Sequence, residues 1–404
     1  MIKRFSRFLL FAPCGAFIAF NFLSAYYITT AGIYNGDFQG IPLVHSYFEV
    51  WGYACVASIP YLILYYIISR GAPINTTPVI LPRLFVLFVL IILILSLVLT
   101  VTYGVGMMAQ GIYSISAPLK PIVVLINRID PVVIAGILIL SPYVKFRTAM
   151  LAAGLLLLIT LVRGSLQYVP FTLLVCFYRF MSHEKSSLKV KETSKLNIYI
   201  LFFIFTALLI NFAPKLYEFR ESIRGIENIN YDFYEFIFGK LVGRLSNLSA
   251  LLMFEGRYDL FYQRIDELQP FAYLIDCLKY FWGGFIKTPV MSHYVYYTSI
   301  LDPNAFGFYA MQTGMLPTMG LSWMKSPIIM VFDIAITFLS IFYTVRLSTF
   351  FLGYSGKYLA MSLLIFSVLS GTPSQFSLPI FHLTVVTAVF LIIKYFAMPR
   401  RKRS

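Results

Sequence analysis

Long apolar runs alternate with short polar links along most of the chain. Many runs approach 20 residues, the length that an α-helix needs to cross the hydrocarbon core of a bilayer. The pattern predicts about ten membrane-spanning helices, over residues 8–30, 50–68, 84–104, 131–144, 148–162, 166–178, 196–213, 326–345, 357–371 and 379–397. The chain is therefore expected to be an all-α, polytopic membrane protein.

Basic residues gather at the ends of alternate runs. The N-terminus, the loop 179–195 and the tail 400–403 are all rich in Lys and Arg. Because positive charge is enriched in cytoplasmic links, these three segments are expected in the cytoplasm. The loops 31–49 and 214–325 are then expected on the outer face, and ten spans satisfy every basic link at once.

The segment 214–325 breaks the apolar pattern. It holds eleven of the seventeen Asp and Glu, and ten of the thirty-two Lys and Arg. We expect three parts: residues 1–213 with seven spans, 214–325 as one large outer loop with interfacial helices, and 326–404 with three spans and a basic cytoplasmic tail. The large loop is the expected working part.

Composition supports the membrane assignment and excludes several classes of function. The chain is 59% hydrophobic and 12% charged, whereas soluble domains carry about 25% charged residues. Its net charge of +15 comes largely from span ends, so nucleic acid is not an expected partner. The four cysteines have no pair spacing, and no nucleotide-binding or metal-binding motif occurs, so neither a cofactor nor a metal is expected.

Two arginines stand out as candidate anion ligands. Arg163 lies between two apolar spans on the predicted outer face, and Arg244 lies in an apolar run with no acid within ten residues on its C-terminal side. A guanidinium fork suits phosphate or pyrophosphate, and neither arginine has an evident local partner. The alternative for Arg163 is a side chain that reaches outer headgroups.

Three further arginines in the large loop are candidate substrate ligands. Arg220 and Arg224 are four residues apart and would share a helix face, although nearby acids favour an ion-pair network equally well. Arg257 lies between Glu255 and Asp259, so a structural salt bridge is its alternative role.

His293 is the one histidine of the large loop and the candidate general base, because its ordinary pKa lies near neutrality. Ordinary polar surface is the alternative reading. Tyr258 and Tyr294 are candidate sugar-stacking residues, although an interfacial aromatic belt explains such tyrosines too. Glu255 or Asp259 could serve as base instead. His45 is also placed outside, with no partner evident.

The basic cytoplasmic ends, the many spans, the single large outer loop late in the chain and the outer arginines together resemble the bacterial O-antigen and polysaccharide repeat-unit polymerases of the Wzy type. The loop's tail, with Gly307, Gly314, Pro317 and Gly320, is similar to that family's approach to the following span. The likeness is one of architecture over nearly the whole chain.

The resemblance implies a GT-C-like fold and a metal-independent, inverting glycosyl transfer at the periplasmic face of the bacterial inner membrane. One undecaprenyl-pyrophosphate-linked oligosaccharide would be the donor and a second would be the acceptor. Membrane lipid and a chain-length regulator protein are the other implied partners. His293, Arg163 and Arg244 would be catalytic, and Arg220, Arg224, Arg257, Tyr258 and Tyr294 would bind substrate.

Three alternatives stay open. The related O-antigen ligases share the scaffold. A flippase or transporter of lipid-linked oligosaccharide would need more spans and charged residues spread through them. A non-catalytic membrane subunit would leave the outer arginines unexplained.

Overall fold

The computed structural model describes the backbone of residues 2–73, 77–104, 123, 129–163, 168–183, 211, 213–215, 217–218, 232–282, 291–301 and 313–397. Every regular element there is a helix, and the one β-type contact in these ranges is a bridge between Ile33 and Pro42. The prediction of an all-α protein is therefore confirmed. The longer helices are α1 (Ile2–Ala31), α2 (Tyr47–Arg70), α3 (Arg83–Tyr103), α5 (Pro131–Leu140), α6 (Phe146–Arg163), α7 (Tyr168–His183), α9 (Leu248–Gly256), α11 (Ala272–Trp282), α12 (His293–Leu301), α13 (Met315–Lys325), α14 (Pro327–Leu352), α15 (Gly356–Ser370) and α16 (Pro373–Ala397).

Shorter helical elements connect them. These are η1 (Gly36–Phe38), the π-helix η3 (Glu235–Val242), α10 (Tyr258–Gln263), η4 (Ile265–Glu267) and η6 (Gly353–Ser355). Glycine allows the turn at η6: Gly353 has φ +57°, and a Cβ on Gly356 would lie 2.4 Å from the backbone of Ser348.

Six helical stretches in the described ranges are long and apolar enough to cross a membrane: Arg7–Ala31, Tyr47–Arg70, Arg83–Tyr103, Phe146–Arg163, Pro327–Ser370 and Gln375–Phe396. Pro131–Leu140 and Tyr168–Met181 are shorter apolar helices. A multi-pass membrane protein is thus supported. The count of about ten spans stays a prediction, and most of the span 196–213 lies outside the described residues.

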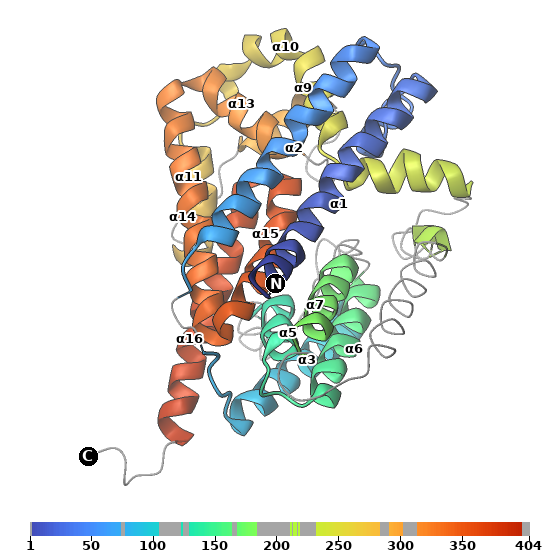
Figure 1. Cartoon of the computed structure of the whole chain (residues 1–404). Helices are drawn as coiled ribbons and strands as arrows, with labels where there is room; N and C mark the ends of the chain where they lie inside the picture. Colours follow the sequence, from blue (N-terminus) through green and yellow to red (C-terminus); the bar gives the residue numbers. More distant parts are fainter. Residues whose placement is uncertain are drawn as a thin grey trace. The chain divides into compact units, whose positions relative to one another are not determined.

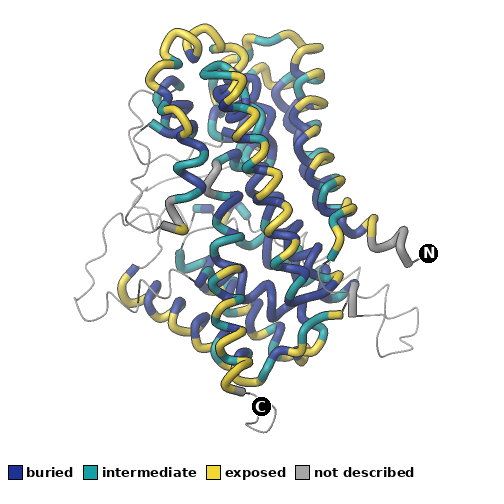
Figure 2. The backbone as a smooth tube through the Cα atoms, turned by 90° about the vertical axis from the view of Figure 1, so that its left-hand side faces the viewer, coloured by how far each residue is buried: buried dark blue, intermediate teal, exposed yellow. Residues whose placement is uncertain are grey.

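The long helices carry their exposed apolar residues on one face and buried residues on the other (Figure 2). On α3 the exposed large side chains include Leu84, Leu87, Ile91, Ile94 and Val98. Soluble proteins rarely expose an apolar face of this extent. A lipid environment explains it.

The chain divides into two compact units. Unit 1 comprises Met1–Ala72, Asp232–Val345 and Leu363–Phe381, and unit 2 comprises Pro73–Tyr231, Arg346–Ser362 and His382–Ser404. The boundaries differ from the predicted division at 213 and 325, because unit 1 joins the first two long helices to the loop segment. That predicted division refers to the membrane, which the structure does not contain, and it stays a prediction.

In unit 1, α1 and α2 run side by side (Figure 1). Helix α9 packs against α2, and α10 and α13 pack against α9. Inside the α1–α2 contact the Asn21 amide donates to Ser58 Oγ at 3.2 Å. A capping box starts α2: Ser46 Oγ accepts from the Glu49 N–H, and the Glu49 carboxylate accepts from the Ser46 N–H. This cap fixes the point at which the loop 31–49 enters the helix.

The helices of the large loop bury aromatic residues together. Phe261 of α10 stacks on Tyr297 of α12 with ring centroids 5.5 Å apart. The Tyr297 hydroxyl donates to the Ala250 carbonyl at 2.7 Å, and the Tyr296 hydroxyl donates to the Phe261 carbonyl. These satisfied hydroxyls tie α9, α10 and α12 into one packed body.

In unit 2, α5 is buried along all ten residues. The Arg179 guanidinium of α7 donates to the carbonyls of Ser141 and Val144 just beyond α5. Lys and Arg often satisfy carbonyls at helix ends, and Arg179 has that role here.

Candidate functional site

Two glycines bring the loop 31–49 against the segment 232–257 within unit 1. A Cβ on Gly243 would lie 2.2 Å from the Gly36 nitrogen, so the two backbones meet where no side chain fits. Gly36 also has φ +72°, a conformation that glycine adopts without strain. The residue after each glycine is charged, and this approach therefore brings Asp37 and Arg244 together.

Arg244 forms an ion pair with Asp37. Its Nε lies 2.8 Å and its Nη2 lies 2.6 Å from Asp37 Oδ1. The Asp37 side chain is 8% exposed, whereas that of Arg244 is 31% exposed. The expectation that Arg244 lacks a partner carboxylate was wrong, because the acid comes from a loop more than 200 positions earlier.

The side chain of Asn35, two residues before Asp37, forms a hydrogen-bonded frame next to this pair. Asn35 Oδ1 accepts from Ser24 Oγ at 2.9 Å and from Ser249 Oγ at 2.6 Å. The Asn35 amide donates to the Phe238 carbonyl at 3.2 Å. One residue thus links α1, η3 and α9.

A small polar pocket opens beside this frame. Asn35, Asp37, Phe38, Gly243, Ser246, Ser249 and Ala250 line it. The pocket has a carboxylate, hydroxyls and an amide on its walls, with the half-exposed Arg244 next to its Gly243 edge. The pocket is only large enough for about one water molecule. The exposed part of the Arg244 guanidinium beside it is therefore the group that an anionic ligand would meet.

A second linked pair lies at the far end of α9. His45 Nε2 is 2.7 Å from Glu255 Oε2, and His45 Nδ1 is 2.8 Å from the Tyr34 hydroxyl. The His45 side chain is 5% exposed and that of Glu255 is 45% exposed. The prediction that His45 has no partner was wrong as well.

Arg257 follows this pair directly. Burial raises the pKa of Tyr34, the charge of Glu255 adds to the rise, and the positive charge of Arg257 opposes it. Arg257 therefore lies within electrostatic reach of the Tyr34–His45–Glu255 group, at the junction between α9 and α10.

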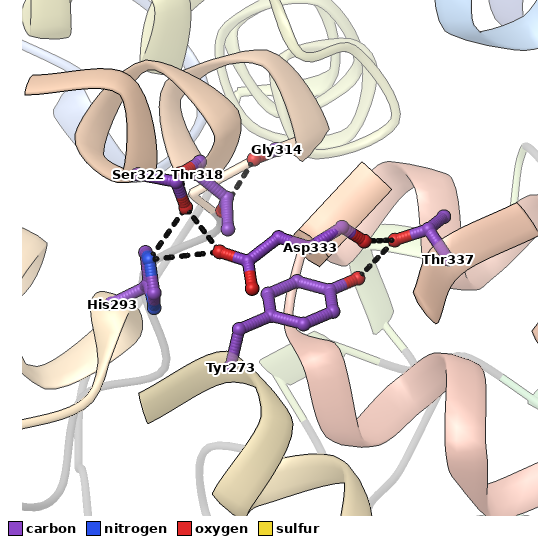
Figure 3. Close-up of polar contacts among 7 residues, drawn as sticks. All are labelled: Tyr273, His293, Gly314, Thr318, Ser322, Asp333 and Thr337. Carbon is purple, nitrogen blue, oxygen red and sulfur yellow. Dashed lines mark hydrogen bonds and ion pairs between the residues drawn. The ribbon is translucent and has the colours of Figure 1, made fainter. Parts of the chain in front are cut away.

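His293 lies in the interior of unit 1. It is 2% exposed, and its Nε2 is 2.8 Å from Ser322 Oγ. Ser322 Oγ in turn lies 2.6 Å from Asp333 Oδ2. Figure 3 shows Ser322 between the other two side chains, with the Tyr273 ring against the Asp333 side chain.

Burial lowers the pKa of His293 to about 4. The Asp333 carboxylate, 3.9 Å from Nε2, favours the imidazolium, but complete desolvation of the ring outweighs that attraction. The imidazole is therefore neutral near pH 7. The expectation of a surface histidine that titrates near neutrality was wrong.

The cluster also contains two unsatisfied acceptors. His293 Nδ1 and Asp333 Oδ1 are buried without a hydrogen-bond partner. Since Ser322 donates to the carboxylate, its oxygen accepts from Nε2–H, which leaves Nδ1 as the bare nitrogen. His293 is thus a helix-packing residue in α12 rather than a group that meets a substrate at the surface.

The predicted tyrosines separate into two groups. Tyr258 is 45% exposed and stacks on Tyr262, with ring centroids 6.5 Å apart, whereas Tyr296 and Tyr297 are fully buried. Tyr296 and Tyr297 therefore have no surface on which a sugar could stack. Tyr294 is half-buried beside His293 on α12, and its role in binding stays a prediction.

Arg163 ends α6 in unit 2. Its Nη2 donates to Ser96 Oγ at 2.9 Å and its Nε donates to Thr100 Oγ1 at 3.2 Å, both on α3. Neutral hydroxyls thus orient this guanidinium. The role of Arg163 as an anion ligand stays a prediction. Arg220 and Arg224 lie outside the described residues.

Arg264 forms an ion pair near its own helix. It contacts both oxygens of Glu267 at 2.7 and 2.8 Å, on the exposed rim of α10. Within the described ranges, no group of three or more His, Cys, Asp and Glu side chains could hold a metal ion.

Comparison with protein-family models, with characterised proteins and with solved structures finds no match to this chain.

Proposed function

We propose that the protein is a glycosyltransferase that polymerises undecaprenyl-pyrophosphate-linked repeat units at the periplasmic face of the bacterial inner membrane. The observation that carries the proposal is Arg244, a partly exposed guanidinium held by Asp37 beside a small polar pocket. Arg244 directly follows Gly243, and its partner Asp37 lines the same pocket.

Arg244 would bind the donor's pyrophosphate. The carboxylate of Asp37 fixes the direction of the guanidinium before a ligand arrives, which reduces the entropy lost on binding. As the glycosidic C–O bond breaks, negative charge grows on the departing pyrophosphate. A guanidinium placed in advance stabilises that charge more strongly in the transition state than in the ground state.

The surroundings of the pocket suit a substrate anchored in lipid. The loop 31–49 and the start of α2 expose Val44, Tyr47 and Phe48, and α1 and α2 are long apolar helices. A pyrophosphate at the membrane surface could thus reach Arg244 while its polyprenyl chain stays among apolar side chains.

Variants of Arg244 test the proposal in a host whose own copy is deleted. A charge-assisted hydrogen bond is worth about 1.5–3 kcal/mol, so Arg244→Ala should lower polymer formation roughly ten- to a hundredfold. Arg244→Lys should restore only part, because an ammonium lacks the planar fork. Arg264→Ala, which removes an exposed guanidinium elsewhere, is the matched control. Normal polymer length from Arg244→Ala at normal protein level would overturn the proposal.

The O-antigen ligase reaction would use the same pocket with a different acceptor, so the acceptor that elongates decides between the two. A specific observation favours a transporter as a second candidate: the buried His293–Ser322–Asp333 cluster includes an acid within a candidate span. Buried ionisable residues in spans often mark ion pathways. Movement of lipid-linked oligosaccharide across vesicles, without bond formation and abolished by Asp333→Asn, would support that candidate.

A further inference from the structure

Glu255 and His45 form a carboxylate–imidazole pair that the proposed anion site does not use. Glu255 Oε2 and His45 Nε2 are 2.7 Å apart, and the loop and helix that supply them are joined across 210 positions of sequence. On its other side His45 Nδ1 meets the Tyr34 hydroxyl at 2.8 Å.

The hydrogen-bond chain has a preferred direction. If Nε2 carries the proton, it donates to the carboxylate while Nδ1 accepts from the Tyr34 O–H, and all three groups are satisfied. Tyr34 is 1% exposed and thus lies behind the histidine. Of the three groups, Glu255 alone is substantially exposed, so it is the group that a substrate can meet.

A glycine makes this contact tight. A Cβ on Gly256 would lie 3.0 Å from His45 Cε1, closer than ordinary contacts allow. Tyr53 packs edge to face against the same imidazole, with centroids 6.2 Å apart. The His45 ring is therefore held from several sides. Its hydrogen bond in turn fixes the position of the Glu255 carboxylate.

We propose that Glu255 is the base that takes the proton of the acceptor sugar's hydroxyl, and that His45 is its positioning residue. This inference rests on the proposed function. The acceptor oxygen forms a bond to the donor's anomeric carbon as the bond from that carbon to the pyrophosphate oxygen breaks. The hydroxyl proton passes to the carboxylate of Glu255, and the bonding electrons leave with the lipid pyrophosphate.

Arg244 and Glu255 lie on either side of most of α9 along the chain. Arg244 comes just before α9, which begins at Leu248, and Glu255 lies in its last turn. At a rise of about 1.5 Å per residue, the helix carries Glu255 on the order of 10 Å beyond its own start.

The test uses the full-length protein in membrane vesicles with lipid-linked repeat units, and measures the polymerisation rate against pH. A base contributes typically 10²–10⁴-fold, so Glu255→Gln should lower the rate about a hundredfold or more and remove the acid limb of the pH profile. Glu267→Gln, the same change on an exposed glutamate paired with Arg264, should change neither.

His45 is tested by rescue. His45→Ala should lower the rate about tenfold or more and displace the acid limb. His45→Gln keeps an N–H donor toward Glu255. At wild-type protein level it should recover much of the rate and return the acid limb of the pH profile toward its wild-type position. A merely structural histidine would lower folded protein without moving the acid limb.

The outcomes separate the two proposals. If the wild type polymerises, and Glu255→Gln or His45→Ala retains its full rate and pH profile, this inference is wrong while the proposed function stands. If the wild type forms no polymer from lipid-linked repeats, the proposed function fails and takes the inference with it.

Discussion

Arg244 Nη2 lies 2.6 Å from Asp37 Oδ1, although 207 positions of sequence separate the two residues. The contact joins the loop 31–49 to the segment before α9 and leaves 31% of the arginine side chain exposed. It therefore has two possible contributions, to the stability of unit 1 and to ligand binding, which separate experiments resolve.

The stability contribution is measured by a double-mutant cycle. Because Asp37 is nearly buried, Asp37→Ala and Arg244→Ala should each lower the free energy of unfolding. The double variant should lose less free energy of unfolding than the two single variants lose together, and the difference, the coupling energy, should be about 1–3 kcal/mol. Thermal unfolding of the purified protein in detergent provides the comparison. Strict additivity would show that the pair contributes no coupled stability.

Gly243→Ala should inactivate the site without altering any charged residue. Its φ of −61° suits alanine, so any loss must come from the close contact with the Gly36 backbone. We expect polymer formation to fall about tenfold or more, comparable to a lost guanidinium contact. Gly52→Ala is the matched control, because a Cβ on Gly52 meets nothing within 4 Å. Equal activity of both variants would contradict the account of how Arg244 is placed.

The buried His293 should make stability depend on pH. The folded protein holds the pKa near 4, against about 6.5 in the unfolded chain. Between these values the unfolded chain binds a proton that the folded protein does not. The contribution of His293 to the free energy of unfolding should therefore fall as pH drops from about 6.5 to about 4, by up to roughly 1.4 kcal/mol per pH unit, and it should be complete above 6.5.

The control for that prediction is His293→Gln, which removes the titrating group. Its unfolding midpoint should fall less steeply than that of the wild type over the same pH range. Parallel curves for the two proteins would contradict the burial-driven shift.

The positions of the long apolar helices were predictable from the lengths of the apolar runs, because the thickness of a bilayer's hydrocarbon core sets the length of such a run. The runs 50–68 and 84–104 correspond to α2 at Tyr47–Arg70 and α3 at Arg83–Tyr103, and each of these helices has an arginine at one end. Charges at span ends limit how far a span can extend, so these boundaries agreed within a few residues.

The contacts of the site were not predictable, since each partner lies about 200 positions away. The ion pair of Asp37 and the hydrogen bond of His45 could not be predicted, because neither residue has a partner nearby in the sequence. The one local signal was the Gly–charged pattern shared by Gly36-Asp37 and Gly243-Arg244, which marks a close backbone approach only once the fold is known. The burial of His293 was not predictable, because a lone histidine in a polar segment gives no local sign that α12 is packed within unit 1.

Labelling of single cysteines tests the predicted orientation, in a background where the four native cysteines are replaced. Gln263, exposed on α10, should react from outside intact cells after substitution by Cys, and Thr77, exposed in the link 70–83, should not. The reason is the placement of basic links in the cytoplasm. Labelling of Thr77→Cys but not Gln263→Cys would reverse the orientation and remove the periplasmic site.

The most direct test of the central claim is reconstitution of the purified protein in liposomes with lipid-linked repeat units from its own host. The account predicts a ladder of products spaced by one repeat unit, with one lipid pyrophosphate released per new linkage, and a ladder at least tenfold weaker with Arg244→Ala. Absence of any ladder from the wild type, or transfer only to a lipid A core acceptor, would contradict it.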